Sequence, residues 1–93
     1  MREHYNHWLY SMSDNDEMEL DQILAVLENP IRRKILMKLS GDTNYPLQLS
    51  KELNVSQQAI MKHLKVLEEN EFVTSFEERS DKGGPPRKVY SPR

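Results

Sequence analysis

The stretch that most constrains the fold is residues 47–73, where two amphipathic helical patterns follow one another across a short break. The first pattern covers residues 48–53 and the second covers residues 56–70, with Asn54 and Val55 between them. Their apolar positions recur at the three- and four-residue spacing of one helix face, and they are Leu49, Leu53, Ile60, Leu64 and Leu67. Two short helices joined by such a turn are typical of a helix-turn-helix, whose second helix can lie in the major groove of DNA.

The outward side of the second helix carries side chains that suit base edges and phosphates. Ser56 is a good N-cap, because its hydroxyl can accept a hydrogen bond from a free backbone amide of the first turn. A glutamine can form a bidentate pair with adenine, a lysine can reach guanine, and a thioether suits the thymine methyl group. The residues of this helix that we expect to contact DNA are Ser56, Gln57, Gln58, Met61, Lys62 and Lys65. The alternative is an ordinary solvated helix face.

Three short motifs in the same region point to a family. Residues 55–58 read Val-Ser-Gln-Gln, residues 63–68 read His-Leu-Lys-Val-Leu-Glu, and residues 72–73 read Phe-Val. With this spacing the chain resembles the winged helix-turn-helix of ArsR-like transcriptional regulators over residues 20–91. The resemblance implies an α+β fold, mainly α, with three to four helices in the core and a two-stranded β-hairpin as the wing. It also implies a sequence-specific regulator that acts as a dimer on double-stranded DNA, through the second helix and the wing at residues 72–91.

Two further helices are predicted ahead of the helix-turn-helix. An apolar stripe of helical spacing indicates the first, and its members are Leu20, Ile23, Leu24 and Leu27. Ser13 or Asp14 would cap this helix. Asn29 and Pro30 end it and begin the next, since proline is tolerated at the first helical position and asparagine is a good cap. The buried face of the second helix is expected at Ile31, Ile35, Leu36 and Leu39.

Four basic residues lie on this second helix, Arg32, Arg33, Lys34 and Lys38. The Asn-Pro-Ile-Arg-Arg-Lys-Ile-Leu run also resembles the matching helix of ArsR-like proteins, which implies that Arg32 and its neighbours lie near the DNA backbone or bridge to acidic partners. The alternative is a solvated helix face.

His63 lies on the helix at residues 56–70, beside its apolar face, and we expect it to be packed rather than to bind a metal.

The C-terminal part of the chain predicts a β-hairpin. Residues 72–78 alternate between apolar and polar side chains, turn residues fill positions 80–86, and residues 87–91 form the returning strand. The side chains expected to face inward are Phe72, Thr74 and Phe76 on the first strand and Val89 or Tyr90 on the second. The cations expected to reach the minor groove or its flanking phosphates are Lys82, Arg87 and Lys88. The alternative is a charged tip that only favours solubility. The Gly-Gly-Pro-Pro-Arg-Lys tip is similar to the wings of archaeal members of the group.

The connections on either side of the helix-turn-helix carry two further expectations. ArsR-like proteins have a glycine at the position of Glu71, and here we expect Asn70 to adopt the left-handed conformation that ends the helix. Tyr45 and Leu47 are expected to form a very short strand that pairs with the wing.

The charge of the chain is unevenly distributed. The formal net charge is -2, but residues 13–28 hold six acidic and no basic residues, whereas residues 79–93 hold five basic residues and one acidic residue. A chain polarised in this way can turn a basic face to phosphates while its acidic end stays in solvent.

Composition excludes several other classes. The chain has 93 residues and no cysteine, so one domain is expected, without disulfides or thiolate metal sites. No apolar run approaches the ~20 residues of a membrane span, and the first residues lack a secretory signal, so a cytoplasmic protein is expected. No nucleophile with a placed base, phosphate loop or carboxylate pair indicates an enzyme.

Metal sensing is not expected either, and no cofactor is predicted. Metal-sensing ArsR-like proteins use cysteines on the first helix of the helix-turn-helix, which is cysteine-free here, or ligands on a C-terminal helix that would lie beyond Arg93. His4 and His7 could share a metal, but no third ligand is in view.

The predicted organisation is an N-terminal arm at residues 1–13 and a winged helix-turn-helix domain at residues 14–93. The arm has a helical stripe consisting of Tyr5, Trp8, Leu9 and Met12. It is either a frayed tail or an anchor for a homodimer formed through the N-terminal helices, since tryptophan and tyrosine are favoured at interfaces. The alternative function is a winged helix that binds proteins without specific DNA binding.

Overall fold

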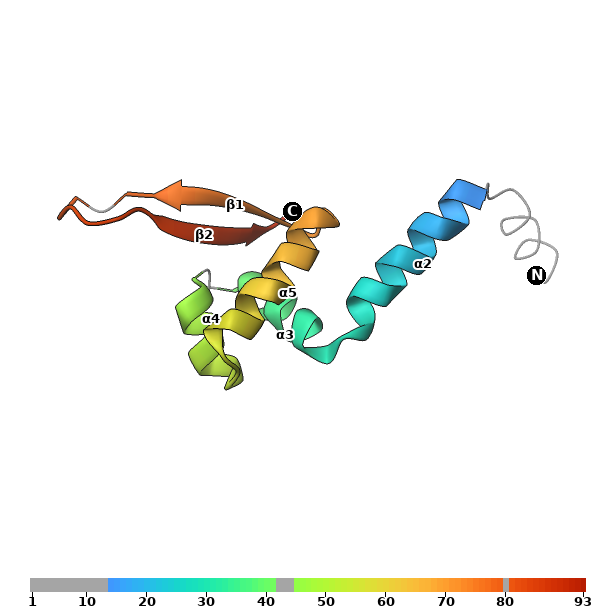
Figure 1. Cartoon of the computed structure of the whole chain (residues 1–93), viewed down its shortest axis with the longest axis horizontal. Coiled ribbons are helices and arrows are strands. Elements are labelled where there is room, and N and C mark those ends of the chain that lie inside the picture. Colours follow the sequence, from blue (N-terminus) through green and yellow to red (C-terminus); the bar gives the residue numbers. More distant parts are fainter. Residues whose placement is uncertain (1–13, 42–44, 80) are drawn as a thin grey trace.

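The structure is a computed structural model, and it describes residues 14–41, 45–79 and 81–93. The elements, in chain order, are α2 (Asp14–Glu28), α3 (Pro30–Leu39), α4 (Pro46–Leu53), α5 (Gln57–Glu69), β1 (Val73–Glu78) and β2 (Arg87–Pro92). Helices α3, α4 and α5 cluster together, the β1–β2 hairpin extends from the cluster, and α2 projects away from it on the opposite side (Figure 1). The predicted winged helix-turn-helix is confirmed.

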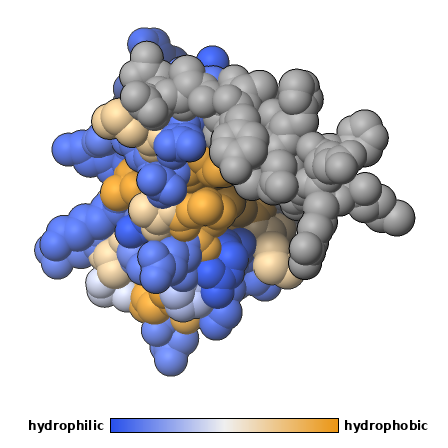
Figure 2. Space-filling model, turned by 90° about the vertical axis from the view of Figure 1, so that its right-hand side faces the viewer, coloured by the Kyte–Doolittle hydropathy of each residue, from blue (hydrophilic) through white to orange (hydrophobic). Residues whose placement is uncertain are grey.

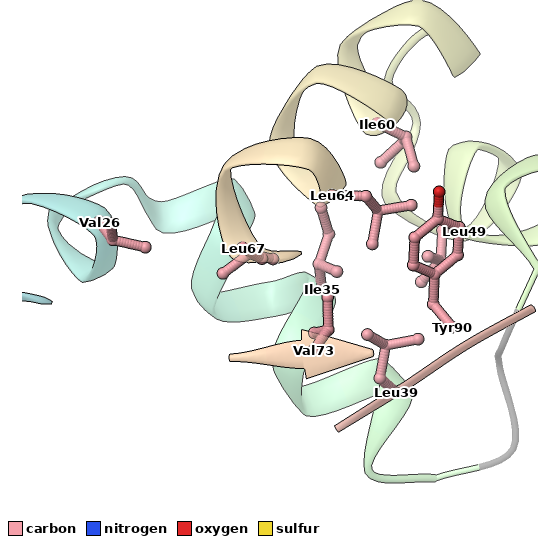
Figure 3. Packing of buried hydrophobic residues seen from close by; sticks show 9 residues of the cluster. All are labelled: Val26, Ile35, Leu39, Leu49, Ile60, Leu64, Leu67, Val73 and Tyr90. Atoms are coloured by element: carbon pink, nitrogen blue, oxygen red, sulfur yellow. The ribbon is translucent and has the colours of Figure 1, made fainter. Parts of the chain in front are cut away.

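The hydrophobic core lies where α3, α4, α5 and the root of the hairpin meet (Figure 3). Each of these elements contributes at least one fully buried side chain, and the set comprises Ile35, Leu49, Ile60, Leu64, Leu67, Val73 and Tyr90. The apolar stripes predicted for the helix-turn-helix and for α3 therefore meet in one core. Burial of this apolar surface, at about 25 cal/mol per Å², is the main force that holds the three helices together.

The predicted helix starts are confirmed for two helices. Asn29 Oδ1 accepts hydrogen bonds from the backbone amides of Ile31 and Arg32, at 2.8 and 3.3 Å, and Pro30 is the first residue of α3. Ser56 Oγ accepts from the Ala59 amide at 3.0 Å, at the start of α5. A cap of this kind typically contributes about 1 kcal/mol to stability, so both breaks between helices are encoded locally.

The end of α5 differs from the prediction. Asn70 keeps a φ of -99°, and Glu71 is the residue in the left-handed region, with a φ of 64°. The Glu71 amide donates to the Glu68 carbonyl at 3.1 Å, and the Phe72 amide donates to the Leu67 carbonyl at 2.8 Å. This pair of bonds is a Schellman motif, which requires its left-handed residue one position later than Asn70. Glutamate therefore adopts a conformation that suits glycine better.

The inward side of β1 was also predicted wrongly. Val73 is buried, whereas Thr74 is exposed and Phe76 is 53% exposed. Phe72 is half-buried and precedes the strand. Both faces of this segment carry apolar or β-branched side chains, and a one-residue shift in register exchanges them.

The return strand is close to the prediction. Strand β2 pairs antiparallel with β1, with Val73 opposite Pro92 and Glu78 opposite Arg87. Val89 and Tyr90 are both buried. The expectation that one or the other turns inward was therefore too narrow, because opposite sides of this strand are covered.

Tyr45 and Leu47 do not form a strand. Pro46 begins α4, so Leu47 lies in the first helical turn, and Tyr45 precedes the helix with an extended backbone, φ -105° and ψ 137°. Proline at the first helical position and an extended residue before it are the expected combination. Tyr45 still reaches the wing, because its hydroxyl donates to Glu78 Oε1 at 2.8 Å.

Helix α2 buries little of its apolar stripe. Val26 is its buried residue, Leu27 is half-buried, and Leu20, Ile23 and Leu24 are exposed. Apolar side chains gather between charged ones on this side of the molecule (Figure 2). The predicted arm at residues 1–13, including Ser13 and the stripe around Trp8, lies outside the described residues. Within the described ranges, every helix is too short or too polar to cross a membrane.

Candidate nucleic-acid interface

Helix α5 divides sharply into a buried and an exposed side. Ile60, Leu64 and Leu67 are fully buried against the core. The side chains predicted for DNA contact on this helix are all exposed, and they are Gln57, Gln58, Met61, Lys62 and Lys65. Ser56 is exposed too, with its hydroxyl bound to the Ala59 amide. The helix is thus anchored along its length on one side, and the other side presents amide, thioether and ammonium groups to solvent.

A groove of about 580 Å³ lies between α4, the start of α5 and the wing. It brings together four residues from the sequence-predicted site, Gln57, Met61, Arg87 and Lys88. The groove is also lined by five residues outside that predicted site, Tyr45, Pro46, Leu47, Gln48 and Lys51. Gln58, Lys62 and Lys65 lie outside it. The helix and the start of β2 therefore form one continuous surface, with α4 as an additional wall.

Tyr45 fastens the end of the wing strands nearest the tip to the start of α4. Its hydroxyl donates to Glu78 Oε1 at 2.8 Å, and the guanidinium carbon of Arg87 lies 5.8 Å from the centre of its ring. The hydrogen bond to Glu78 raises the pKa of Tyr45 above its ordinary value, so the phenol remains a donor at neutral pH. An arginine over an aromatic ring at an exposed site gains about 0.5–1 kcal/mol. The lone signal for Tyr45 in the sequence was its position before a proline.

The other wing cations lie in different surroundings. Lys88 Nζ is 4.0 Å from Glu68 Oε1 on α5 and 5.6 Å from the centre of the Tyr90 ring. An exposed ion pair of this kind contributes about 0–1 kcal/mol, so a phosphate can compete for Lys88. Lys82 is exposed in the turn between the two strands.

Arg32 and Arg33 bind the end of α2 and are not free cations on a solvated face. Arg32 Nη1 donates to the Val26 carbonyl at 3.0 Å, and Arg33 Nη1 donates to the carbonyls of Leu27 and Glu28 at 2.6 and 2.8 Å. Carbonyls in the last turn of a helix lack intrahelical partners and carry partial negative charge, which favours cations there. Sequence reasoning considered DNA, acidic partners and solvent for these arginines, and missed this role.

His63 is half-buried, as expected for a packed residue. Its Nδ1 accepts a hydrogen bond from Arg32 Nε at 3.3 Å. Burial lowers the pKa of His63, and the positive charge of Arg32 lowers it further. A neutral ring at pH 7 follows, with its proton on Nε2. The described parts of the chain contain no cluster of three histidine, aspartate or glutamate side chains that could hold a metal ion.

A comparison with known families identifies this arrangement. The model of the bacterial regulatory protein, arsR family, matches residues 29–75, which is half of the chain. The chain belongs to the arsR family. The match begins at the Asn29 cap and ends in β1, so it spans the helix-turn-helix and the start of the wing.

A solved structure extends the likeness over most of the fold. Reduced HlyU from Vibrio cholerae N16961 has a TM-score of 0.66 with this chain at 21% sequence identity, and the alignment covers 85% of this chain and 77% of HlyU. At this identity the likeness concerns the fold. No curated protein matches the sequence.

The arsR-family assignment establishes the general function of the chain. This chain is a DNA-binding transcription regulator and not an enzyme, as the sequence predicted. The likeness of its wing to those of archaeal members stays a prediction.

Proposed function

We propose that this arsR-family regulator binds double-stranded DNA sequence-specifically as a homodimer. In this proposal α5 enters the major groove and the wing lies over the adjacent minor groove or its phosphates. The observation that supports it best is the one-sided burial of α5, which leaves its whole polar side exposed next to the wing cations.

Sequence preference would come from the first two turns of α5. Gln58, Met61 and Lys62 are exposed there, and a bidentate amide or an ammonium group discriminates between bases by about 1–3 kcal/mol per good contact. Gln57 lines the groove next to the wing, where it and the Ser56 backbone would meet a phosphate at the helix N-terminus. Lys65, Lys82, Arg87 and Lys88 would contact the backbone and set the affinity.

A second copy of the chain would cover α2. Leu24 is 57% exposed, and Leu20, Ile23 and Met18 are exposed on the same helix. Apolar side chains gathered in this way are typical of an interface. Binding to a two-fold site would require an axis through this face that places two copies of α5 on one side of a duplex, about 34 Å apart. Part of the proposal is that residues 14–93 form the DNA-binding domain and the arm at residues 1–13 adds to the dimer contact.

The proposal is tested by selecting preferred duplexes from a random library and measuring the affinity of the best duplex by fluorescence anisotropy at several salt concentrations. We expect an enriched two-fold sequence, and an affinity whose log-log slope against salt is about 0.9 per phosphate contacted. Absence of duplex binding at low salt would instead support a winged helix that binds proteins.

A further inference from the structure

A single guanidinium group joins the three helices on which the proposed function depends. Arg32 extends from α3, its Nη1 donates to the Val26 carbonyl of α2 at 3.0 Å, and its Nε donates to His63 Nδ1 of α5 at 3.3 Å. We propose that Arg32 is a positioning residue that sets α2 against α5, and that its bond to His63 makes specific DNA binding depend on the protonation of that ring. This inference rests on the proposed function, because it concerns the geometry of the DNA-binding dimer.

The orientation of helix α2 depends strongly on the two Arg32 bonds, to the Val26 carbonyl and to His63, which together are called the joint. Of its described side chains only Val26 is buried, and the carbonyls at its C-terminal end are held by Arg32 and Arg33. The helix has 15 residues, so its length is about 22 Å, and a tilt of about 10° at the joint would move its far end by roughly 4 Å. In a dimer formed through α2, the same tilt changes the distance and angle between the two copies of α5. Half-site spacing is therefore coupled to the Arg32 contacts.

The joint requires an unprotonated acceptor. A neutral imidazole has one accepting nitrogen, whereas both nitrogens of a charged imidazolium are donors. Protonation of His63 therefore removes the acceptor for Arg32 Nε and places two cations at hydrogen-bond distance from each other. Repulsion between them favours a different arrangement of Arg32, and with it of the α2 end that Arg32 holds.

Arg32, on α3, carries the charge that lowers the pKa of His63. The positions one helical turn from His63 on α5 carry no titratable group, and they are Ala59, Ile60, Val66 and Leu67. Helix α2 faces the joint with the Val26 carbonyl. No carboxylate is thus bonded to the ring among the described residues, and none stabilises its charged form.

The direction of the pH dependence follows from these surroundings. Burial and the Arg32 charge lower the pKa of His63 in the folded chain below its unfolded value of about 6.5. The stability contributed by the neutral ring is complete above the unfolded pKa, and it is lost as the pH falls through the folded pKa. The joint is therefore closed at neutral pH and opens when the pH falls below the ordinary titration range of histidine.

Distances within the chain test the joint without DNA. The chain has no cysteine, so spin labels can be attached to Glu19→Cys on α2 and Glu69→Cys on α5, both exposed positions. Labelled chains are diluted with an excess of unlabelled chains, so that only distances within one chain are read. We expect the distance distribution to shift between about pH 7.5 and the lower pH at which NMR shows His63 to be protonated. It should stay unchanged in His63→Asn, whose amide oxygen replaces Nδ1 and cannot be protonated.

A second variant covers the case in which His63→Asn does not fold. A lysine at position 32 keeps the charge but cannot donate to the Val26 carbonyl and to His63 through one planar group. Arg32→Lys should therefore show, at about pH 7.5, the distances that the parent chain shows once His63 is protonated.

The functional measurement is the affinity for the selected duplex divided by the affinity for a random duplex, at constant salt. This ratio should fall about tenfold on acidification in the parent chain, within the usual range of coupling between sites, and should change little in His63→Asn.

The outcomes separate the two proposals. Label distances that do not respond to pH while His63 titrates by NMR would overturn the joint, whatever the DNA measurements show. A shift of the distances in a chain that binds no duplex would support the joint and refute the proposed function.

Discussion

Removal of the Arg87 charge gives the sharpest test of the wing. Arg87 is exposed at the start of β2, its guanidinium lies over the Tyr45 ring, and it shares the groove with Gln57 and Met61. In Arg87→Ala the Tyr45–Glu78 hydrogen bond can remain. The loss in stability should therefore stay within the ~0.5–1 kcal/mol of an exposed cation–aromatic contact, and the main change should appear in DNA binding.

The expected size of that change follows from the number of phosphates released. One Arg87 contact in each copy gives two in a dimer, so the log-log slope of affinity against salt should become shallower by about 1.8. Between about 50 and 200 mM salt, a slope difference of this size changes the affinity ratio of parent and variant by about twelvefold. The parent should bind all duplexes more tightly at low salt, and most of its advantage should disappear at high salt.

The assay is fluorescence anisotropy with one selected and one random duplex across this range of salt. The matched control is Lys34→Ala, which removes the same charge from an exposed position on α3. Equal slopes for Arg87→Ala and the parent chain would show that the wing does not touch DNA. Equal changes in the two variants would show that net charge, and not the wing contact, is responsible.

Three further predictions concern other parts of the molecule. Lys62→Ala should reduce the preference between selected and random duplexes by about 1–3 kcal/mol in a competition assay, and an unchanged preference would place Lys62 away from the bases. Leu24→Glu should raise the dimer dissociation constant at least about 100-fold in sedimentation equilibrium, since two copies lose apolar burial. The control is Met37→Glu, also at an exposed position but on α3, which should leave the dissociation constant unchanged. Glu71→Gly should raise the free energy of unfolding by about 0.5–1 kcal/mol in urea, because it relieves a left-handed glutamate at a small entropic cost, and a loss of stability would show that the Glu71 side chain matters more than its backbone.

The helices were predictable because their signals are local. Ser56 and Asn29 each provide a cap within one turn of the helix they begin, and the stripe of Ile60, Leu64 and Leu67 has the period of a helix with one buried side. These features depend on neighbours within a few residues, so the sequence contains enough information to place them.

The wing was predicted less well because its details depend on distant contacts. Both faces of β1 carry side chains that suit burial, and packing on the core selects Val73 over Phe76. The left-handed residue at the end of α5 is instead fixed locally, by two backbone bonds from Glu71 and Phe72 to the last turn of the helix. Asparagine at position 70 is the better intrinsic choice for that conformation, but the geometry of the turn decides.

The candidate site could be predicted only in part from the sequence, because some of its residues act through contacts outside their own helical turn. The outward residues of α5 followed from the helical pattern, and their exposure agrees with it. Tyr45 and the arginines of α3 act through contacts with residues 33, 31 and 6 positions away. A cation on an amphipathic helix gives no local sign of which carbonyl or ring it binds.

Tyr90 has a consequence for how such a wing can change during evolution. Its side chain is 2% exposed and lies among the core residues, only two positions after Lys88 (Figure 3). The base of the hairpin is therefore part of the folded interior, while its far turn, with Gly83 and Gly84 at positive φ, touches nothing that a new side chain would displace. Charge changes at the other exposed residues of that turn can therefore alter the affinity for phosphates with little effect on the core, whereas a side chain at Gly83 or Gly84 would strain the backbone.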